Sequence, residues 1–165
     1  MIRIVPWRKE FSKCDFCCTV SDLDEYFRCR VGQDIRRRVT SCFVALDGNG
    51  SVAGYYTLSA ASILLDRLPE EVRRKLPRYT SIPAVEFGRL AVAWNFQHIG
   101  LGAALVYDAW RKSLASEIAA YAMIVHAKNP SVGSFYSHNG FTAFKDNPLC
   151  FYISLELCKK LLQQV

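Results

Sequence analysis

The chain has 165 residues, a length that suits one compact domain, and 51% of them are hydrophobic, which is enough for a sizeable core. No apolar run of about eighteen residues or more occurs, and the first residues, MIRIVPWRKEF, lack the apolar stretch of a secretion signal, so we expect a cytosolic protein without a membrane span. The net charge of +6 favours polyanionic partners.

The seven cysteines are an odd number in a chain without an export signal, which indicates reduced thiols rather than a disulfide framework. Cys14, Cys17 and Cys18 form a C-x-x-C-C cluster that resembles half of a zinc site, but no second pair at ligand spacing follows. The histidines are scattered: His98, His126 and His138. We therefore expect no metal site, and buried thiols that pack as small hydrophobic groups.

Two helices are predicted near the N-terminus, after a short edge strand over 2–5 that Pro6 ends. Ser21 and Asp24 have the spacing of a capping box, so a helix is expected to start near Asp22. Gly32 is expected to break this helix, and a second short helix is predicted over 33–38.

The remaining elements alternate between strands and helices. Asp47–Gly50, DGNG, is a strong hairpin turn signal between two apolar segments. Strands are predicted over 41–46, 52–60, 83–92, 121–127, 141–144 and 149–153, and helices over 70–76, 100–116, 130–138 and 156–164. Periodicity alone gives only an α/β or α+β class, and without linkers or repeats it predicts a single domain over 1–165.

The segment Val85–Gly102, VEFGRLAVAWNFQHIGLG, is the most informative part of the chain. It predicts a strand, a link and a turn, Gln97-x-x-Gly100-x-Gly102, that opens a helix. The first backbone N–H groups of a helix are unpaired, and together with the helix dipole they favour an anion. Glycine lets a phosphate approach the backbone closely, so the pattern predicts a phosphate site.

A second motif lies downstream, where Asn129 is followed by Tyr136 and then by Asn139-Gly140-Phe141, within NPSVGSFYSHNGF. Together with GRLAV and QxxGxG, it resembles the GNAT superfamily of acyl-CoA-dependent N-acyltransferases over about 44–153. The narrower resemblance is to the acetyltransferase toxins of bacterial toxin–antitoxin pairs. An arginine at the position of Arg89 is also typical of these toxins. The resemblance implies an α/β (α+β) GNAT fold whose mixed, mostly antiparallel sheet is splayed between its fourth and fifth strands and flanked by helices.

The resemblance also implies acetyl-CoA as cofactor. The glycine turn would hold the pyrophosphate through its backbone, and the preceding strand would pair with the pantetheine arm and bind the acetyl oxygen. Ile99 stands where the family commonly has a basic residue, so we expect weaker cofactor binding. The implied cofactor-binding residues are Leu90, Ala91, Val92, Gln97, His98, Ile99, Gly100, Leu101, Gly102, Ala103, Asn129 and Ser134.

Tyr136 is the catalytic residue implied by the resemblance, as the acid that protonates the leaving thiolate, because a phenol has a higher pKa than a thiol. The alternative is a core aromatic among phenylalanines. Glu86 is a candidate general base that shares a strand face with Leu90 and Val92 by period-2 counting, or simply an edge carboxylate. His126 is expected in the core and His138 in solvent.

The basic residues gather in two segments. Either segment alone indicates a solvated helix face, whereas the two together leave contact with RNA as an equal alternative, tempered by the interspersed Asp34, Glu70 and Glu71. The candidate tRNA-binding residues are Arg36, Arg37, Arg38, Arg73, Arg74, Lys75 and Arg78. The leading hypothesis is N-acetylation of the α-amino group of aminoacyl-tRNA, which blocks translation, by a homodimeric toxin that a cognate antitoxin, of the ribbon-helix-helix type, neutralises. The alternatives are acetylation of a small amine or a protein N-terminus, and a non-enzymatic domain that binds CoA or a partner as a regulator.

Overall fold

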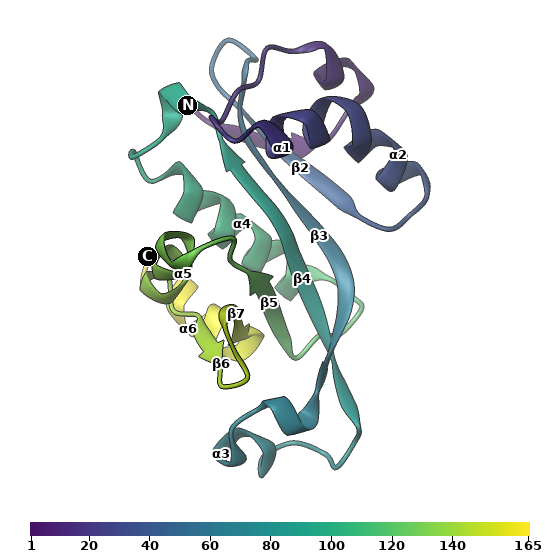
Figure 1. The fold of residues 1–165 in the computed structure, drawn as a ribbon, viewed down its shortest axis with the longest axis vertical. Helices are drawn as coiled ribbons and strands as arrows, with labels where there is room; N and C mark the ends of the chain where they lie inside the picture. Colours follow the sequence, from purple (N-terminus) through teal and green to yellow (C-terminus); the bar gives the residue numbers. More distant parts are fainter. The chain divides into compact units, whose positions relative to one another are not determined.

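The computed structural model describes residues 1–165 and contains one seven-stranded, mostly antiparallel sheet in the order β1-β2-β3-β4-β5-β7-β6, with β4 and β5 parallel (Figure 1). The strands are β1 (Arg3–Pro6), β2 (Ser41–Leu46), β3 (Val52–Leu64), β4 (Ser81–Val92), β5 (Ala122–His126), β6 (Thr142–Phe144) and β7 (Asn147–Ser154). The α-helices are α1 (Ser21–Glu25), α2 (Val31–Arg36), α3 (Glu70–Arg73), α4 (Leu101–Ala115), α5 (Pro130–His138) and α6 (Leu155–Leu162). Shorter helical turns are η1 (Lys9–Lys13), η2 (Tyr26–Arg30), η3 (Leu65–Arg67) and η4 (Trp94–Phe96).

Contacts divide the chain into two compact units, each made of two stretches of sequence. The first comprises Met1–Ser59 with Gly88–Asp108, and the second comprises Ala60–Phe87 with Ala109–Val165. The chain passes between the units within β3, β4 and α4, so these three elements contribute residues to both.

In the first unit, neighbouring tyrosines of β3 show which helices cover which face of the sheet. The hydroxyl of Tyr55 donates to the carbonyl of Leu23 in α1 at 2.7 Å, and the hydroxyl of Tyr56 donates to Asp108 in α4 at 2.6 Å. Because successive side chains of a strand point to opposite faces, α1 and α4 cover opposite faces. The face under α1 carries a buried aromatic cluster that includes Phe11, Phe16, Tyr26, Phe27 and Tyr55.

In the second unit, α5 packs on β7. Phe151 of β7 lies against Gly133, where a Cβ would come 3.1 Å from its ring, so the helix approaches the strand closely. Alternate residues of the strands build a separate buried cluster with the segment around α3: Ile63, Leu68, Ile82, Ala84, Ala122, Ile124, Phe144, Cys150 and Tyr152. The intervening residues of β5 and β7, such as Met123, Val125, Phe151 and Ile153, are buried too, so these strands are covered on both faces.

The predicted capping box is wrong. Helix α1 starts at Ser21 and its N-cap residue is Val20, which makes no side-chain cap. The carboxylate of Asp24 instead accepts a 2.9 Å bond from the backbone N–H of Cys18, so this acidic residue fixes the preceding loop.

Gly32 does not break the helix, which is also a correction. A π-helical turn, η2, follows α1 directly and continues into α2, which contains Gly32. A Cβ at Gly32 would lie 2.8 Å from the ring of Trp7, so the glycine is needed for close packing rather than for a stop.

The hairpin prediction is confirmed. The amide N–H groups of Asn49 and Ser51 both donate to the carboxylate of Asp47, and Gly50 has a φ of 81°. The predicted strands and later helices are present with shifted ends, and the largest difference is β3, which extends to Leu64. No helix is both long enough and apolar enough to cross a membrane.

Candidate functional site

The glycine turn forms the backbone cradle that the sequence predicts. His98 and Gly100 have φ values of 63° and 88°, a left-handed conformation that a glycine adopts without strain. Helix α4 begins at Leu101, and the amide of Ala104 donates to the carbonyl of Gly100 at 3.1 Å. The three preceding N–H groups of the helix, from Leu101 to Ala103, therefore have no acceptor within the helix and are available to an anion.

Gln97 holds this turn in place with its side chain. Its Nε2 donates to the carbonyl of Val92 at 2.9 Å and to the carbonyl of Cys18 at 3.0 Å. The amide of Trp94 also donates to the carbonyl of Cys17 at 2.9 Å. Since both amide hydrogens of Gln97 are used, this side chain has no N–H left to donate to a cofactor.

The end of β4 has backbone groups that point away from β3. The amide of Ala93 donates to the carbonyl of Ala53 at 2.8 Å, and the amide of Arg89 donates to the hydroxyl of Thr57 at 2.9 Å. Backbone groups alternate along an antiparallel strand, so those of Leu90 and Val92 face the other side. The backbone of Ala91 faces β3, so this residue is not placed to pair with a pantetheine arm.

The pairing between β4 and β5 covers only part of β4. The register runs from Ala84 opposite Ala122 to Phe87 opposite Val125, whereas β4 continues to Val92. The parallel ladder therefore ends before the segment that carries the outward-facing groups of Leu90 and Val92, as expected for the splayed sheet.

Asn129 and Ser134 have local roles in α5. The Oδ1 of Asn129 accepts the amide of Val132 at 3.0 Å, which makes it the N-cap, and Pro130 follows at the first helical position. The hydroxyl of Ser134 donates to the carbonyl of Pro130 at 3.1 Å. The side chain of Asn129 therefore fixes the backbone at the start of α5.

Tyr136 lies among aromatic rings in the second unit and is only 5% exposed. Its ring meets the rings of Phe87 and Phe141 edge-on, at centroid distances of 6.4 and 5.4 Å. Burial raises the pKa of Tyr136 well above its usual value. The hydroxyl therefore stays protonated at neutral and moderately alkaline pH, as a proton donor must.

His126 is not a core residue, contrary to the sequence prediction. It is the last residue of β5, its side chain is 57% exposed, and its Nε2 lies 3.4 Å from Oε1 of Glu86, which is 37% exposed. The buried positions of β4 change from Ile82 and Ala84 to Phe87 and Ala91, so period-2 counting does not hold along the whole strand and does not establish a shared face for Glu86 and Val92. His138 is exposed, as expected.

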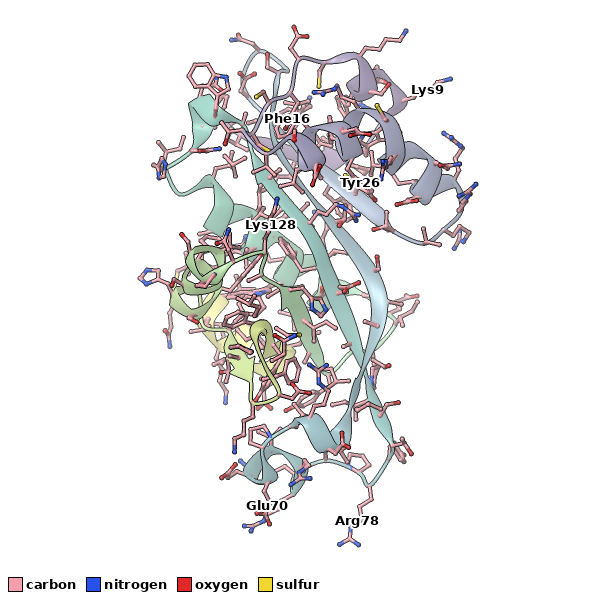
Figure 2. The ribbon with its side chains drawn as sticks, viewed as in Figure 1. Lys9, Phe16, Tyr26, Glu70, Arg78 and Lys128 are labelled. Atoms are coloured by element: carbon pink, nitrogen blue, oxygen red, sulfur yellow. The ribbon has the colours of Figure 1, made fainter.

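The candidate tRNA-binding residues are exposed in both units. In the first unit, Arg36 is the last residue of α2, and Arg37 and Arg38 follow it. In the second unit the basic residues surround α3, where Figure 2 shows Glu70 and Arg78 on the same projecting segment, and Arg74 pairs with Glu70 at 3.0 Å. Acidic residues therefore neutralise part of this second group.

Tyr26 and Asp34 of the first unit hold Arg89 in place, a role that the sequence did not predict. The guanidinium carbon of Arg89 lies 3.6 Å from the ring centroid of Tyr26, and the hydroxyl of Tyr26 donates to Asp34 at 2.8 Å. The GRLAV motif singles out Arg89, but no local pattern connects it to a tyrosine 63 positions earlier.

No family model matches the chain. A curated relative, a tRNA-acetylating toxin of Mycobacterium tuberculosis (strain ATCC 25618 / H37Rv), is 31% identical over 142 residues, which cover 85% of this chain and 84% of the relative. Among solved structures, AtaT complexed with acetyl-methionyl-tRNAfMet has a TM-score of 0.84 at 25% identity and covers 98% of this chain and 99% of that one. AtaTR bound with AcCoA has a TM-score of 0.79 at 25% identity, with 98% of each chain covered.

Proposed function

This chain belongs to the family of tRNA-acetylating toxins, which have the GNAT fold, and on that premise we propose that it transfers an acetyl group from acetyl-CoA to the α-amino group of aminoacyl-tRNA. Acetylation removes the nucleophilic amine that peptide-bond formation requires, so the product cannot accept a growing peptide and translation stops.

The observation that carries this proposal is the backbone cradle at the start of α4. The left-handed Gly100 and the free N–H groups of Leu101, Gly102 and Ala103 supply donors for a pyrophosphate without any side chain. The N–H groups of Leu90 and Val92 and the carbonyl of Leu90 supply a strand edge for the pantetheine arm, whereas the carbonyl of Val92 accepts from Gln97. Ile99 adds no charge, so the backbone carries the phosphate binding.

Acetyl-CoA supplies the activated acyl group as a thioester when it is bound. Transfer breaks the C–S bond and forms a C–N bond, the amine loses one proton, and the thiolate gains one. A backbone N–H of the outward-facing set would stabilise the negative charge that develops on the acetyl oxygen. Tyr136, whose burial raises its pKa, holds the proton that the thiolate accepts. Glu86, paired with His126, is a further candidate for the group that takes the proton from the amine.

The exposed basic residues would bind the phosphate backbone of the tRNA, which sets affinity rather than the choice of amino acid. These are Arg36, Arg37, Arg38, Arg73, Arg74, Lys75 and Arg78. We propose further that the protein is a cytoplasmic homodimer with a single functional domain over 1–165, and that a cognate antitoxin of the ribbon-helix-helix type neutralises it.

The test is to mix the purified protein with labelled acetyl-CoA and a total pool of charged tRNA, with stripped tRNA and Tyr136→Phe as controls. We expect label only in the charged pool, and a rate about 10² to 10⁴ times lower for the variant, as for the loss of a general acid. Bound acetyl-CoA without labelled tRNA would reject the tRNA substrate and redirect the search to small amines and protein N-termini.

A further inference from the structure

Three residues of the first unit form a chain of contacts that fixes a cation on β4. The hydroxyl of Tyr26 donates to Oδ2 of Asp34 at 2.8 Å, and the guanidinium of Arg89 lies over the face of the Tyr26 ring at 3.6 Å. A phenol that donates to a carboxylate carries more electron density in its ring, which strengthens the attraction to the cation. Tyr26 is buried and Arg89 is exposed, so the guanidinium packs on the Tyr26 ring on one side and is open to solvent on the other.

The π-helical turn explains why Tyr26 and Asp34 meet. Eight residues of regular α-helix rotate by about 800°, which would leave the two side chains about 80° apart. The wider turn η2 (Tyr26–Arg30) absorbs about one residue, so the pair behaves almost as if seven residues apart and shares one helix face. π-Helical turns occur frequently at functional sites.

The backbone of Arg89 is fixed as well. Its amide donates to Oγ1 of Thr57 at 2.9 Å, and a Cβ on the preceding Gly88 would come 2.9 Å from the same oxygen. Both ends of the Arg89 residue are therefore anchored, which pre-organises the guanidinium in one place.

The N–H groups of this guanidinium make no hydrogen bond or ion pair within the unit, and the charge of Asp34 is directed to the Tyr26 hydroxyl instead. Arg67 in the second unit shows the contrast. It lies 4.0 Å from the ring centroid of Phe144, but its Nε and Nη2 both donate to the carboxylate of Asp146. Arg89 keeps the planar fork that binds a phosphate through two parallel bonds.

The side of β4 on which Arg89 lies separates it from the cofactor cradle. Tyr26 and Ala91 belong to the cluster under α1, whereas a Cβ at Gly54 would meet Leu105 of α4 and Val92 on the other face. The pyrophosphate is assigned to the start of α4, so a phosphate at Arg89 would belong to the acceptor substrate. The basic end of α2, Arg36 with the following Arg37 and Arg38, begins two residues after Asp34.

We propose that Arg89 binds a phosphodiester close to the aminoacylated 3′ end of the tRNA, and that Tyr26 and Asp34 are the positioning residues that hold it there. This inference rests on the proposed function and names a specificity contact for it. Arg89 would favour an amine carried by a nucleic acid over the same amine on a small molecule.

The experiment compares two acceptors, a charged tRNA and the corresponding aminoacyl-adenosine, which carries the same amine and no phosphate. We expect Arg89→Gln to lower kcat/KM for the charged tRNA about tenfold to a hundredfold, as for a lost charged hydrogen-bond pair, and to leave the value for aminoacyl-adenosine within about twofold. The slope of log kcat/KM against log salt should become shallower by about one. Arg30→Gln, which removes an exposed arginine paired with Glu25 at 3.4 Å, is the matched control and should change neither acceptor preference nor slope by as much.

Tyr26 variants test the positioning role. Tyr26→Phe keeps the ring under the guanidinium and should retain most of the preference for charged tRNA, whereas Tyr26→Leu should lose about threefold to tenfold of it. An equal effect of both variants on the preference would reject the role of the ring. If Tyr26→Leu does not fold, a loss of preference in Tyr26→Phe as large as that in Arg89→Gln would reject it, because the ring is still present in that variant.

The outcomes separate this inference from the proposed function. If the wild type fails to acetylate charged tRNA, the proposed function is wrong and the inference falls with it. If the wild type acetylates charged tRNA but Arg89→Gln impairs both acceptors equally, the inference alone is wrong. A higher KM for acetyl-CoA, with the acceptor preference unchanged, would assign the phosphate to the cofactor instead.

Discussion

The backbone amide of Arg89 donates to the side-chain hydroxyl of Thr57 at 2.9 Å, at a place where a regular pair of strands would supply a carbonyl. Thr57 is 1% exposed, so its hydroxyl replaces a backbone acceptor inside the sheet. The contact fixes β4 immediately before the segment that is proposed to hold the cofactor.

Thr57→Val should destabilise the protein. Valine has nearly the same shape but no acceptor, so the partly buried amide of Arg89 loses its partner, at a cost of about 1–3 kcal/mol in the free energy of unfolding. Urea denaturation measures this loss. Thr57→Ser keeps the hydroxyl and removes only a methyl group, so it should cost less than the valine variant; the reverse order would show that the methyl group matters more than the hydrogen bond.

Gln97→Met should weaken the binding of acetyl-CoA without touching a phosphate. The substitution keeps the length of the side chain but removes the bonds to the carbonyls of Val92 and Cys18, so the turn before α4 is no longer tied to the N-terminal loop. We expect Kd for acetyl-CoA, measured by calorimetry, to rise about fivefold to thirtyfold, the equivalent of one to two neutral hydrogen bonds. Gln33→Met, at an exposed position of α2, is the control; an unchanged Kd for Gln97→Met would show that the turn is rigid without the clamp.

Asp146→Asn should lower stability in a manner that depends on pH. Arg67 donates two hydrogen bonds to this carboxylate and thereby lowers the pKa of Asp146. A lowered pKa means that the stabilisation is present above the ordinary pKa of an aspartate and is lost as the pH falls through the lowered value. The difference in unfolding free energy between wild type and variant should therefore be largest at neutral pH and shrink towards pH 3. A difference that stays constant over this range would show that charge plays no part.

The thiols should divide into two classes. Cys17 and Cys29 are exposed and should react quickly with an aromatic disulfide reagent in the folded protein. Cys18, Cys42, Cys150 and Cys158 are buried, and burial raises the pKa of Cys18 to about 11 and of Cys158 to about 12, so these groups should react only on unfolding. Cys14 is partly buried and burial raises its pKa, so it should react slowly in the native state. We expect two fast thiols in the native state and seven after denaturation, counted by absorbance. Fewer than seven in denaturant without reductant would indicate a disulfide.

The raised thiol pKa values also predict alkaline instability. A folded-state pKa above the unfolded value means that the unfolded chain loses its proton first as the pH rises, so stability is complete below pH 9 and falls above it. For Cys18 the decline spans pH 9 to about 11. Cys18→Ala should flatten this part of the profile, and an identical profile for the variant would exclude Cys18 as a contributor.

Local patterns predict much of the fold because each pattern has a local physical cause. The DGNG turn places a glycine at the position with positive φ, and the QHIGLG turn opens α4 as expected. Packing overrides propensity elsewhere: Gly32 stays inside a helix because Trp7 needs the space, and Asp24 turns to the amide of Cys18 rather than to its own helix end. These contacts join residues of different segments, so no local pattern predicts them.

In the candidate site too, the features within one segment are predicted from the sequence, and the contacts between distant segments are not. The backbone cradle lies within one continuous segment, so the sequence is sufficient to place it. The apolar residues of β5 predict a buried His126, which is wrong. His126 is the last residue of the strand, and its side chain lies beside Glu86 with more than half of its surface exposed. The contact between Arg89 and Tyr26 depends on two segments that meet only in the folded chain.

The π-helical turn has a consequence for how this sequence should be compared with its relatives. A single inserted codon within an ancestral α-helix would produce such a turn while the residues on either side keep their positions. Relatives with a regular helix here should carry the tyrosine and the aspartate seven residues apart, so a correct alignment places a one-residue gap between Tyr26 and Asp34. An alignment without that gap would shift either the tyrosine or the basic end of α2 by one position. A position that is conserved among the relatives would then look variable.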